Sequence, residues 1–331
     1  MKRKAISIIS LVLILTLVFS ACGKSGSGGD KDSSGGGSSV SLKFATGGTT
    51  GTYYAFGGII SQVLQDNIEG LSATIHSSGA SKANIFELVD GDADIALVQN
   101  DVAHYAYTGT DLFEADGAEQ GFSIVAGLYA EVCQVVTTKN ITSIDQLKDK
   151  RVSVGDTGSG TEFNAKQILE VYGISFDDID KHNLSFGDSA NALKDGKIDA
   201  FFCVAGAPTT AIVDLSTTNS INILEVDDEH AAQLKENYGF YSQYTIPGGS
   251  YKGVDQDVKT VAVKATLVAS NKLSEDVIYS ITKTLFEKKD DIAAGHDKGK
   301  ELSVENAVEG FSSVPFHPGA EKYYKEIGVI Q

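Results

Sequence analysis

The chain has 331 residues, enough for two compact lobes of ordinary domain size, and a formal net charge of −17 at pH 7. So acidic a chain repels nucleic acid and anionic lipid, which excludes an electrostatic role in nucleic-acid binding. No CxxC spacing and no cluster of histidines indicates a metal site, and no cofactor is expected.

The N-terminal segment predicts export. Basic residues at 2–4 precede an apolar run over 8–19, which is the pattern of a secretory signal peptide over 1–21. The run is shorter than the roughly 18 to 20 apolar residues that a membrane-spanning helix needs. Because the removed segment carries three basic and no acidic residues, cleavage lowers the formal net charge from −17 to −20.

Cys22 is the candidate lipidation site. It follows Ser20 and Ala21, as the acylated cysteine of a lipoprotein follows small residues, although Phe19 stands where Leu or Val is usual. The next residues are almost all Gly, Ser, Asp and Lys, a composition typical of a flexible coil, so 22–40 is interpreted as a tether. Two or more lipid chains would then anchor the protein to the extracytoplasmic face of the cell membrane. The alternative is ordinary cleavage after Ala21, with the cysteine unmodified.

Past the tether, short apolar strand patterns alternate with longer helical patterns. Strands are predicted over 42–45 and 73–76, and helices over 54–65 and 83–89. Strand, helix, strand, helix is the order of an α/β sheet.

This pattern then occurs a second time. A glycine-rich loop over 47–54 opens one helix, and a similar loop over 155–163 opens another. Each is followed by a helix that ends at a glycine and turns into a buried strand, over 88–96 and 193–201. The first glycines of the loops precede these later glycines by 44 and 41 residues. Two similar βαβ lobes therefore face each other across a cleft.

The chain is expected to cross between the lobes twice. An apolar strand over 133–136 leads into a new strand over 151–154, and a strand over 260–269 brings the chain back. Two antiparallel hinge strands let a few residues absorb opening and closing. Helices over 274–287 and 319–325 complete the first lobe, so the predicted domains are 41–134 and 265–331 for lobe 1 and 135–264 for lobe 2.

The loops at helix starts are the candidate binding elements. Backbone N–H groups and the helix dipole at such a start attract an anion at the carboxyl end of the preceding strand. The alternative for any one loop is an ordinary capped helix start. The candidate ligand contacts from the three loops are Thr49, Thr50, Gly51, Thr52, Tyr53, Ser78, Gly79, Thr157, Gly158, Ser159, Gly160 and Thr161.

Further candidates lie at strand ends. Gln99 and Asp101 follow a buried strand, at the edge where open α/β sheets bind ligands. Tyr129 supplies an apolar wall. Glu131 is interpreted either as a residue that binds an ammonium group of the ligand or as one that stabilises the hinge. Arg151, the only arginine after the signal peptide, is expected on the surface, so no guanidinium fork holds a carboxylate.

The remaining patterns argue against an enzyme. Neither a dinucleotide fingerprint, nor a phosphate loop, nor a G-x-S-x-G nucleophile elbow occurs, and the histidines are scattered singly. Cys133 and Cys203 lie in apolar strand patterns and are interpreted as buried free thiols, with a disulfide as the alternative.

Over nearly all of the mature domain the chain resembles the TAXI-type solute-binding proteins of tripartite ATP-independent periplasmic (TRAP) transporters. The order of the motifs is more specific than any one of them. The matching segments are the 47–54 loop with Gly57 and Gly58, Ser78-Gly79 with Asn84, 99–101, Tyr129 with Glu131, 152–163, 205–208, 260–267, 277–284 and 316–324.

This resemblance implies a type II periplasmic-binding-protein fold and adds Gly206 to the candidate contacts. The implied cargo is a small anionic solute, such as glutamate, glutamine or a related hydroxy or oxo acid. The implied partner is an integral-membrane subunit driven by a sodium or proton gradient, and the receptor itself is expected to be a monomer. An ABC importer or a membrane sensor kinase using the same kind of receptor remains the alternative.

Overall fold

The structure, a computed structural model, describes residues 39–138 and 140–331. The predicted signal peptide, the lipidation site Cys22 and the first part of the tether lie outside these residues. No helix within the described ranges combines the length and apolar composition needed to cross a membrane.

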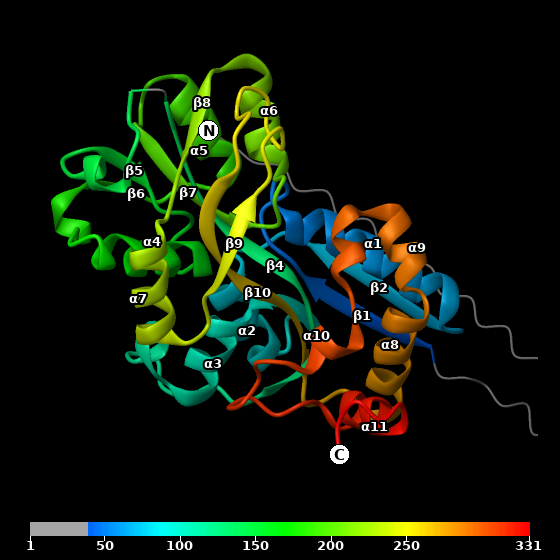
Figure 1. Cartoon of the computed structure of the whole chain (residues 1–331). Helices are drawn as coiled ribbons and strands as arrows, with labels where there is room; N and C mark the ends of the chain where they lie inside the picture. Colours follow the sequence, from blue (N-terminus) through cyan, green and yellow to red (C-terminus); the bar gives the residue numbers. More distant parts are fainter. Residues whose placement is uncertain (1–38, 139) are drawn as a thin grey trace, which may run out of the picture. The chain divides into compact units, whose positions relative to one another are not determined.

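One mixed sheet runs through the described chain (Figure 1). Its strand order is β2-β1-β3-β10-β4-β7-β5-β6, with β8 also paired to β4 and β9 to β10. The pairs among β1, β2 and β3 and among β5, β6 and β7 are parallel, whereas β4 and β10 are antiparallel to their neighbours. The strands are β1 (Val40–Ala45), β2 (Leu71–His76), β3 (Ile95–Gln99), β4 (Phe122–Thr138), β5 (Arg151–Ser153), β6 (Asp180–His182), β7 (Ala200–Ala205), β8 (Ile221–Leu224), β9 (Ser242–Ile246) and β10 (Val258–Ser270).

Helices cover both faces of each half of this sheet, as in a doubly wound α/β fold. In lobe 1, α1, α8, α9 and α11 pack on one face and α2 and α3 on the other; in lobe 2, α4 and α7 oppose α5 and α6. The helices are α1 (Thr52–Asn67), α2 (Ser81–Asp90), α3 (Asn100–Thr108), α4 (Gly160–Val171), α5 (Phe186–Lys194), α6 (Thr210–Thr218), α7 (Asp228–Tyr238), α8 (Glu275–Glu287), α9 (Lys289–Gly295), α10 (Val304–Val308) and α11 (Pro318–Glu326), with short 3₁₀ turns η1 (Asp111–Phe113), η2 (Ile144–Leu147), η3 (Phe176–Asp178) and η4 (Asp297–Glu301).

Strands β4 and β10 belong to both lobes. Tyr129 of β4 packs in a core of lobe 1, whereas Val132 packs in a core of lobe 2. On β10 the change falls at Lys264, where the pairing with β4 also shifts register and the Lys264 amide donates to Asn100 Oδ1 instead (2.9 Å). An interrupted ladder bends more easily than a continuous one. The division of the chain at 134 and 264 stays our proposal.

The helices and strands predicted from the sequence are present, but the residues at which they begin and end differ from the predicted ones. The strand expected over 133–136 is the last part of β4, which has 17 residues. Cys133 and Cys203 lie on the adjacent strands β4 and β7 and are both free. They pack in different cores, on opposite faces of the sheet, which explains why they do not pair.

Candidate functional site

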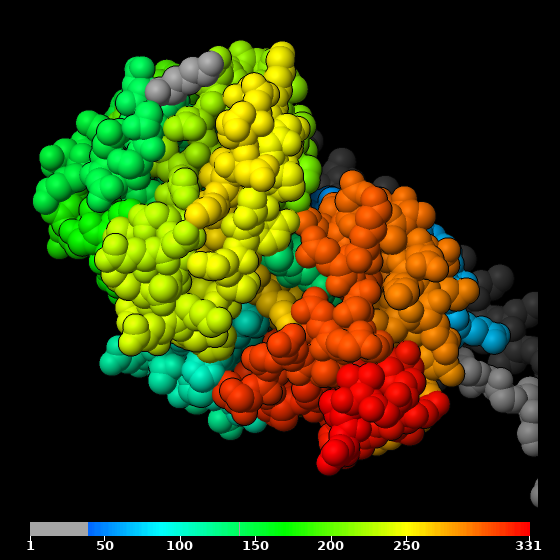
Figure 2. All heavy atoms as spheres, in the orientation of Figure 1, coloured from blue at the N-terminus to red at the C-terminus, as the bar shows by residue number. Residues whose placement is uncertain are grey.

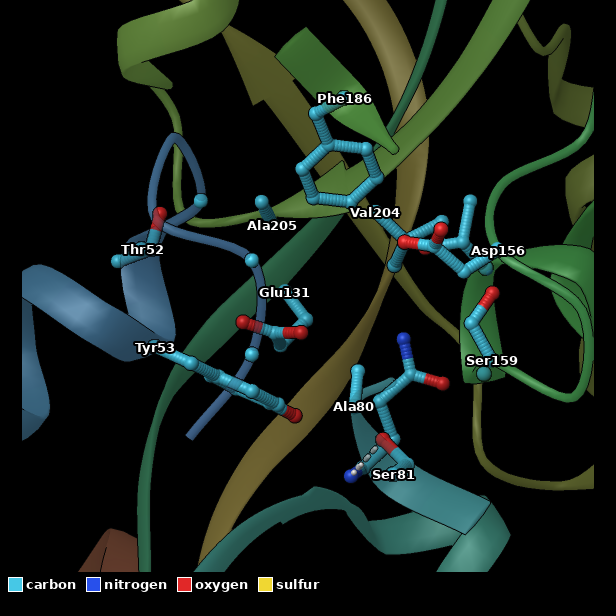
Figure 3. A pocket seen from close by; sticks show the side chains of 16 residues that line it. Thr52, Tyr53, Ala80, Ser81, Glu131, Asp156, Ser159, Phe186, Val204 and Ala205 are labelled. Carbon is cyan, nitrogen blue, oxygen red and sulfur yellow. Dashed lines mark hydrogen bonds between the residues drawn. The ribbon is translucent and has the colours of Figure 1, made fainter. Parts of the chain in front are cut away.

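A cavity lies between the lobes, beneath the starts of four helices. Its void measures about 500 Å³ including the part open to solvent, and about 40 Å³ of it is open to the centre of a water molecule. The second figure corresponds to room for about three waters or for one compact solute. The lining residues, shown in Figure 3, are Gly47, Gly48, Gly51, Thr52, Tyr53, Ala80, Ser81, Gln99, Glu131, Asp156, Ser159, Gly160, Thr161, Phe186, Val204 and Ala205.

The helix starts come from both lobes. Helices α1 and α2 of lobe 1 begin at Thr52 and Ser81, and α4 and α5 of lobe 2 begin at Gly160 and Phe186. Neither α1 nor α2 has a side-chain cap, because Gly51 and Ala80 occupy their N-cap positions. Their first amide groups therefore remain free to donate to a ligand, and the dipoles favour negative charge there.

Unpaired polar atoms converge on the same place. Among the described residues, four buried atoms in or beside the cavity lack a hydrogen-bond partner: Tyr53 OH, Gln99 Oε1, Tyr129 OH and Glu131 Oε1. Buried polar groups are almost always paired in folded proteins, since an unpaired one costs about 1–3 kcal/mol. Their convergence leaves unused hydrogen-bonding capacity at one place, which makes this cavity the candidate ligand site.

Glu131 is the most unusual of these groups. It is only 2 % exposed and lies where β4 passes from lobe 1 to lobe 2. Burial raises its pKa to about 8, and the polar groups of Tyr129, Tyr53 and Gln99, which point toward it without completing a hydrogen bond, oppose that rise only in part. Without a ligand the carboxyl group is therefore mostly protonated at neutral pH.

The charges of the cavity are all acidic. Glu131 and Asp156 line it, and burial also raises the pKa of Asp156, with a further contribution from Asp188. The lining within the described chain includes no lysine, arginine or histidine. Arg151 lies elsewhere and binds the Asp199 carboxylate through Nε (3.0 Å) and Nη2 (2.7 Å). Its surface position agrees with the interpretation of the sequence.

Direct contacts between the lobes close the cavity. Thr52 Oγ1 of α1 donates to the Gly206 carbonyl of lobe 2 (3.1 Å). The Gln99 amide lies over Gly160, where a β-carbon would overlap it. Gly160 therefore permits the end of β3 to approach the start of α4.

A second set of interlobe contacts lies behind the cavity, and we call it the latch: Asp101, Tyr105, Asn164, Gln167 and Tyr241. Asn164 Nδ2 of α4 donates to Asp101 Oδ2 of α3 (2.9 Å) and to Tyr241 OH (2.8 Å). Gln167 Nε2 donates to Tyr105 OH (3.2 Å), and Tyr241 OH donates to Gln167 Oε1 (2.5 Å). The latch joins α3 of lobe 1 to α4 of lobe 2, so the structure is of a closed form.

The residues predicted as ligand contacts fall into several places. Those that line the cavity are Gly51, Thr52, Tyr53, Gln99, Ser159, Gly160 and Thr161. Thr49, Thr50, Ser78 and Gly79 line a separate, open depression next to it. Tyr129 lies beside Glu131, and the Gly206 carbonyl accepts from Thr52. Three others lie outside the lining: Asp101 in the latch, Thr157 exposed, and Gly158 with its amide bound to Glu162 Oε2 (2.7 Å).

Some lining residues were not among the predicted contacts. For Glu131 the sequence offers one signal, its position in the strand that runs into the hinge. Ser81 and Asp156 adjoin or lie within the predicted loops, so the loops themselves pointed to them. Phe186, Val204 and Ala205 carry no comparable signal, because only the fold brings α5 and the end of β7 to the cavity.

A wider and more open groove also borders β4 and β10, and its void measures about 1920 Å³ including the part open to solvent. It separates the lobe 2 segment 238–242 from the segment 306–312, which begins within α10, as Figure 2 shows. Tyr129, Ala130 and Lys264 form part of its wall. In the part of the chain that the structure describes, no three His, Cys, Asp or Glu side chains gather to hold a metal ion.

Several solved structures share this fold. PhnD1 from Prochlorococcus marinus MIT 9301, in complex with methylphosphonate, has a TM-score of 0.54 and 12% identity over 88% of this chain and 99% of its own. The alkanesulfonate-binding protein SsuA from Xanthomonas axonopodis pv. citri, bound to MOPS, has a TM-score of 0.51 and 14% identity over 87% and 84%. A protein from Bordetella bronchiseptica RB50 has a TM-score of 0.51 and 18% identity over 88% and 89%.

At these identities the likeness establishes the fold alone. It confirms the predicted α/β architecture of the type II periplasmic-binding-protein kind. Residues 44–328 match the NMT1-like family, and the chain belongs to that family.

Proposed function

We propose that this protein is an exported solute-binding protein whose lobes close on a small carboxylate-bearing solute and present it to a membrane transporter. The observation that carries this proposal is the closed cavity at the lobe interface, where four helix starts meet four unpaired buried polar atoms. Two proteins with the same fold were solved with small anionic compounds, methylphosphonate and MOPS.

In this proposal the solute's carboxylate lies near the uncapped starts of α1 and α2 and near Ser159, Gly160 and Thr161 of α4. Amide and hydroxyl donors hold it without an arginine. The cavity excludes a large cargo, because closure leaves space for one compact molecule. The protein binds without turnover, so conversion of a candidate acid by the purified protein would contradict the proposal.

The proposed partner is the membrane subunit of a TRAP transporter, which the TAXI-type resemblance supports, with Cys22 as the lipid anchor. An ABC importer is the alternative. The two predict different neighbouring genes, a large multi-spanning integral subunit for the first and an ATPase for the second. Loss of solute uptake on deletion of the gene would separate transport from a role in signalling.

The direct test is mass spectrometry of small molecules released on denaturing freshly purified protein, followed by calorimetry with each compound found. Small-angle scattering with and without that compound should show a smaller radius of gyration in its presence, because a ligand touching α1 and α4 together favours the closed form. The proposal fails if no small molecule is released and no amino acid or organic acid binds. Binding without any change in scattering would instead indicate a rigid pocket.

A further inference from the structure

We propose that Glu131 receives a cationic ammonium group of the solute, which makes the cargo an amino acid and excludes hydroxy and oxo acids. This inference rests on the proposed function and narrows it to one chemical class. It also makes Glu131 the residue that determines specificity at this site.

The first support is the hydrogen-bonding chemistry of the unpaired atoms. Glu131 Oε1 and Gln99 Oε1 are oxygen acceptors, and the hydroxyl oxygens of Tyr53 and Tyr129 can accept as well. Each tyrosine hydroxyl also carries one donor of its own, but with an ionised Glu131 the four atoms together accept more hydrogen bonds than they donate, and they favour a ligand group rich in donors. An ammonium group carries three N–H donors and no acceptor, whereas a hydroxyl offers one donor and a keto oxygen none.

The second support is charge. The ionisable side chains that interact with Glu131 are Tyr53, Tyr129, Cys133, Cys203 and Lys298. Lys298 is the only basic one among them. Lys298 is already paired, because its Nζ lies 2.7 Å from Glu301 Oε1. A solute with negative charge alone would meet Glu131 and Asp156 with no basic side chain in the described lining. A buried carboxylate is strongly destabilising unless a cation compensates it.

The third support is the arrangement of the two ends of the site. Figure 3 shows Glu131 and Tyr53 on one side of the cavity and Ser159 and Asp156 on the other. An α-amino acid carries its ammonium and carboxylate groups on one carbon, so it can place the ammonium group at Glu131 and the carboxylate at the start of α4. The helix dipoles and the Glu131 carboxylate then each meet the charge that they favour.

Binding should exchange a proton for the ammonium group. The polar neighbours Tyr53, Gln99 and Tyr129 all belong to lobe 1 and stay beside Glu131 when the lobes open, so we expect its carboxyl group to be mostly protonated before binding. When the ammonium ion arrives, the O–H bond of the carboxyl group breaks, the carboxylate pairs with the ammonium group, and the proton leaves to the buffer. Near pH 7 about one proton is released per solute bound.

The test compares amino acids with their matched α-keto acids, including glutamate with α-ketoglutarate and alanine with pyruvate. Calorimetry of the full mature chain in phosphate and in Tris gives the affinity and, from the difference in heat, the number of protons released. We expect at least one amino acid to bind at least about 100-fold more tightly than its keto acid. We also expect release of about one proton.

Glu131→Gln should weaken binding of the amino acid by at least tenfold and abolish proton release. Glu87→Gln, a half-buried partner of His76 away from the cavity, is the matched control and should bind as the wild type does. If Glu131→Gln fails to fold, the wild-type preference and proton release alone decide the question.

The outcomes separate the two proposals. A keto acid that binds wild type as tightly as its amino acid, or amino acid binding without proton release, overturns the role of Glu131 and leaves the proposed function standing. Keto acid binding that is lost when choline chloride replaces sodium chloride overturns the role of Glu131 as an ammonium site. It indicates that a sodium ion pairs with the Glu131 carboxylate instead. If no acid of either series binds, the proposed function fails and the inference fails with it.

Discussion

Replacing Asn164 with alanine should weaken solute binding although Asn164 does not line the cavity. Its Nδ2 atom donates across the lobe interface to Asp101 Oδ2 (2.9 Å) and within lobe 2 to Tyr241 OH (2.8 Å). Burial raises the pKa of Asp101 to about 6, against the effect of the Asn164 hydrogen bond, so the carboxylate is still mainly ionised at pH 7.5. A buried charged acceptor that loses its donor costs about 1.5–3 kcal/mol.

That cost applies to the closed form alone, because α3 and α4 belong to different lobes. Because solute binding requires the closed form, which the substitution destabilises, the dissociation constant for the solute should rise by about 10- to 100-fold. Calorimetry measures the change, and scattering should show a larger radius of gyration at a solute concentration that closes the wild type.

The matched control is Asn222→Ala, which removes a hydrogen bond from Asn222 Nδ2 to the Ile141 carbonyl inside lobe 2 (3.0 Å). It should lower the free energy of unfolding by about 1 kcal/mol and leave the dissociation constant unchanged. Wild-type affinity in Asn164→Ala, with the folded structure intact, would refute the idea that the latch forms on closure.

Four further predictions follow from the same contacts. Burial raises the pKa of Glu131 to about 8, so ionising its carboxyl group as the pH rises destabilises the folded protein. The free energy of unfolding without solute should therefore fall by about 2–3 kcal/mol from pH 6 to pH 8. Urea titrations should show that slope in wild type and lose it in Glu131→Gln; an equal slope in both would assign it to another group. Gly160→Val should abolish detectable binding in calorimetry, because its side chain displaces the Gln99 amide and enters the cavity that both residues line. Arg151→Ala should leave the dissociation constant within about threefold of the wild-type value, because the guanidinium pairs with Asp199 outside the cavity. A loss of about 3 kcal/mol in binding free energy would contradict the assignment of the cavity as the binding site. Cys22→Ser should move the protein from the membrane fraction to the soluble fraction, and wild type found wholly in the medium would exclude the anchor.

Local sequence patterns predict much of this fold. The alternation of apolar strands and amphipathic helices depends on neighbouring residues, and so does the glycine-rich start of α1 or α4. The repeated pattern therefore indicated two lobes and placed Gly51 to Tyr53 and Ser159 to Thr161 at the cleft, where they line the cavity.

Other contacts depend on tertiary structure and escape such patterns. A hydroxyl in a loop contacts the cavity only if the path of the loop turns it inward, and Thr157 is turned to solvent instead. The rule that ligands bind at the carboxyl ends of strands placed Asp101 near the cleft, yet its carboxylate accepts from Asn164 across the lobe interface. Phe186 reaches the cavity because the tertiary fold brings the start of α5 against Gly51, the N-cap of α1, and no local spacing encodes that contact.

The place of Glu131 on β4 has a kinetic consequence. A side chain at the point where a strand passes between two moving bodies is displaced least when they rotate, so Glu131 stays in place while the starts of α1 and α4 separate. An incoming solute can engage this fixed point and one lobe before the other lobe arrives. Capture then has an order: a fast encounter whose rate depends on the open cleft, followed by a slower closing step that no increase in solute concentration can accelerate.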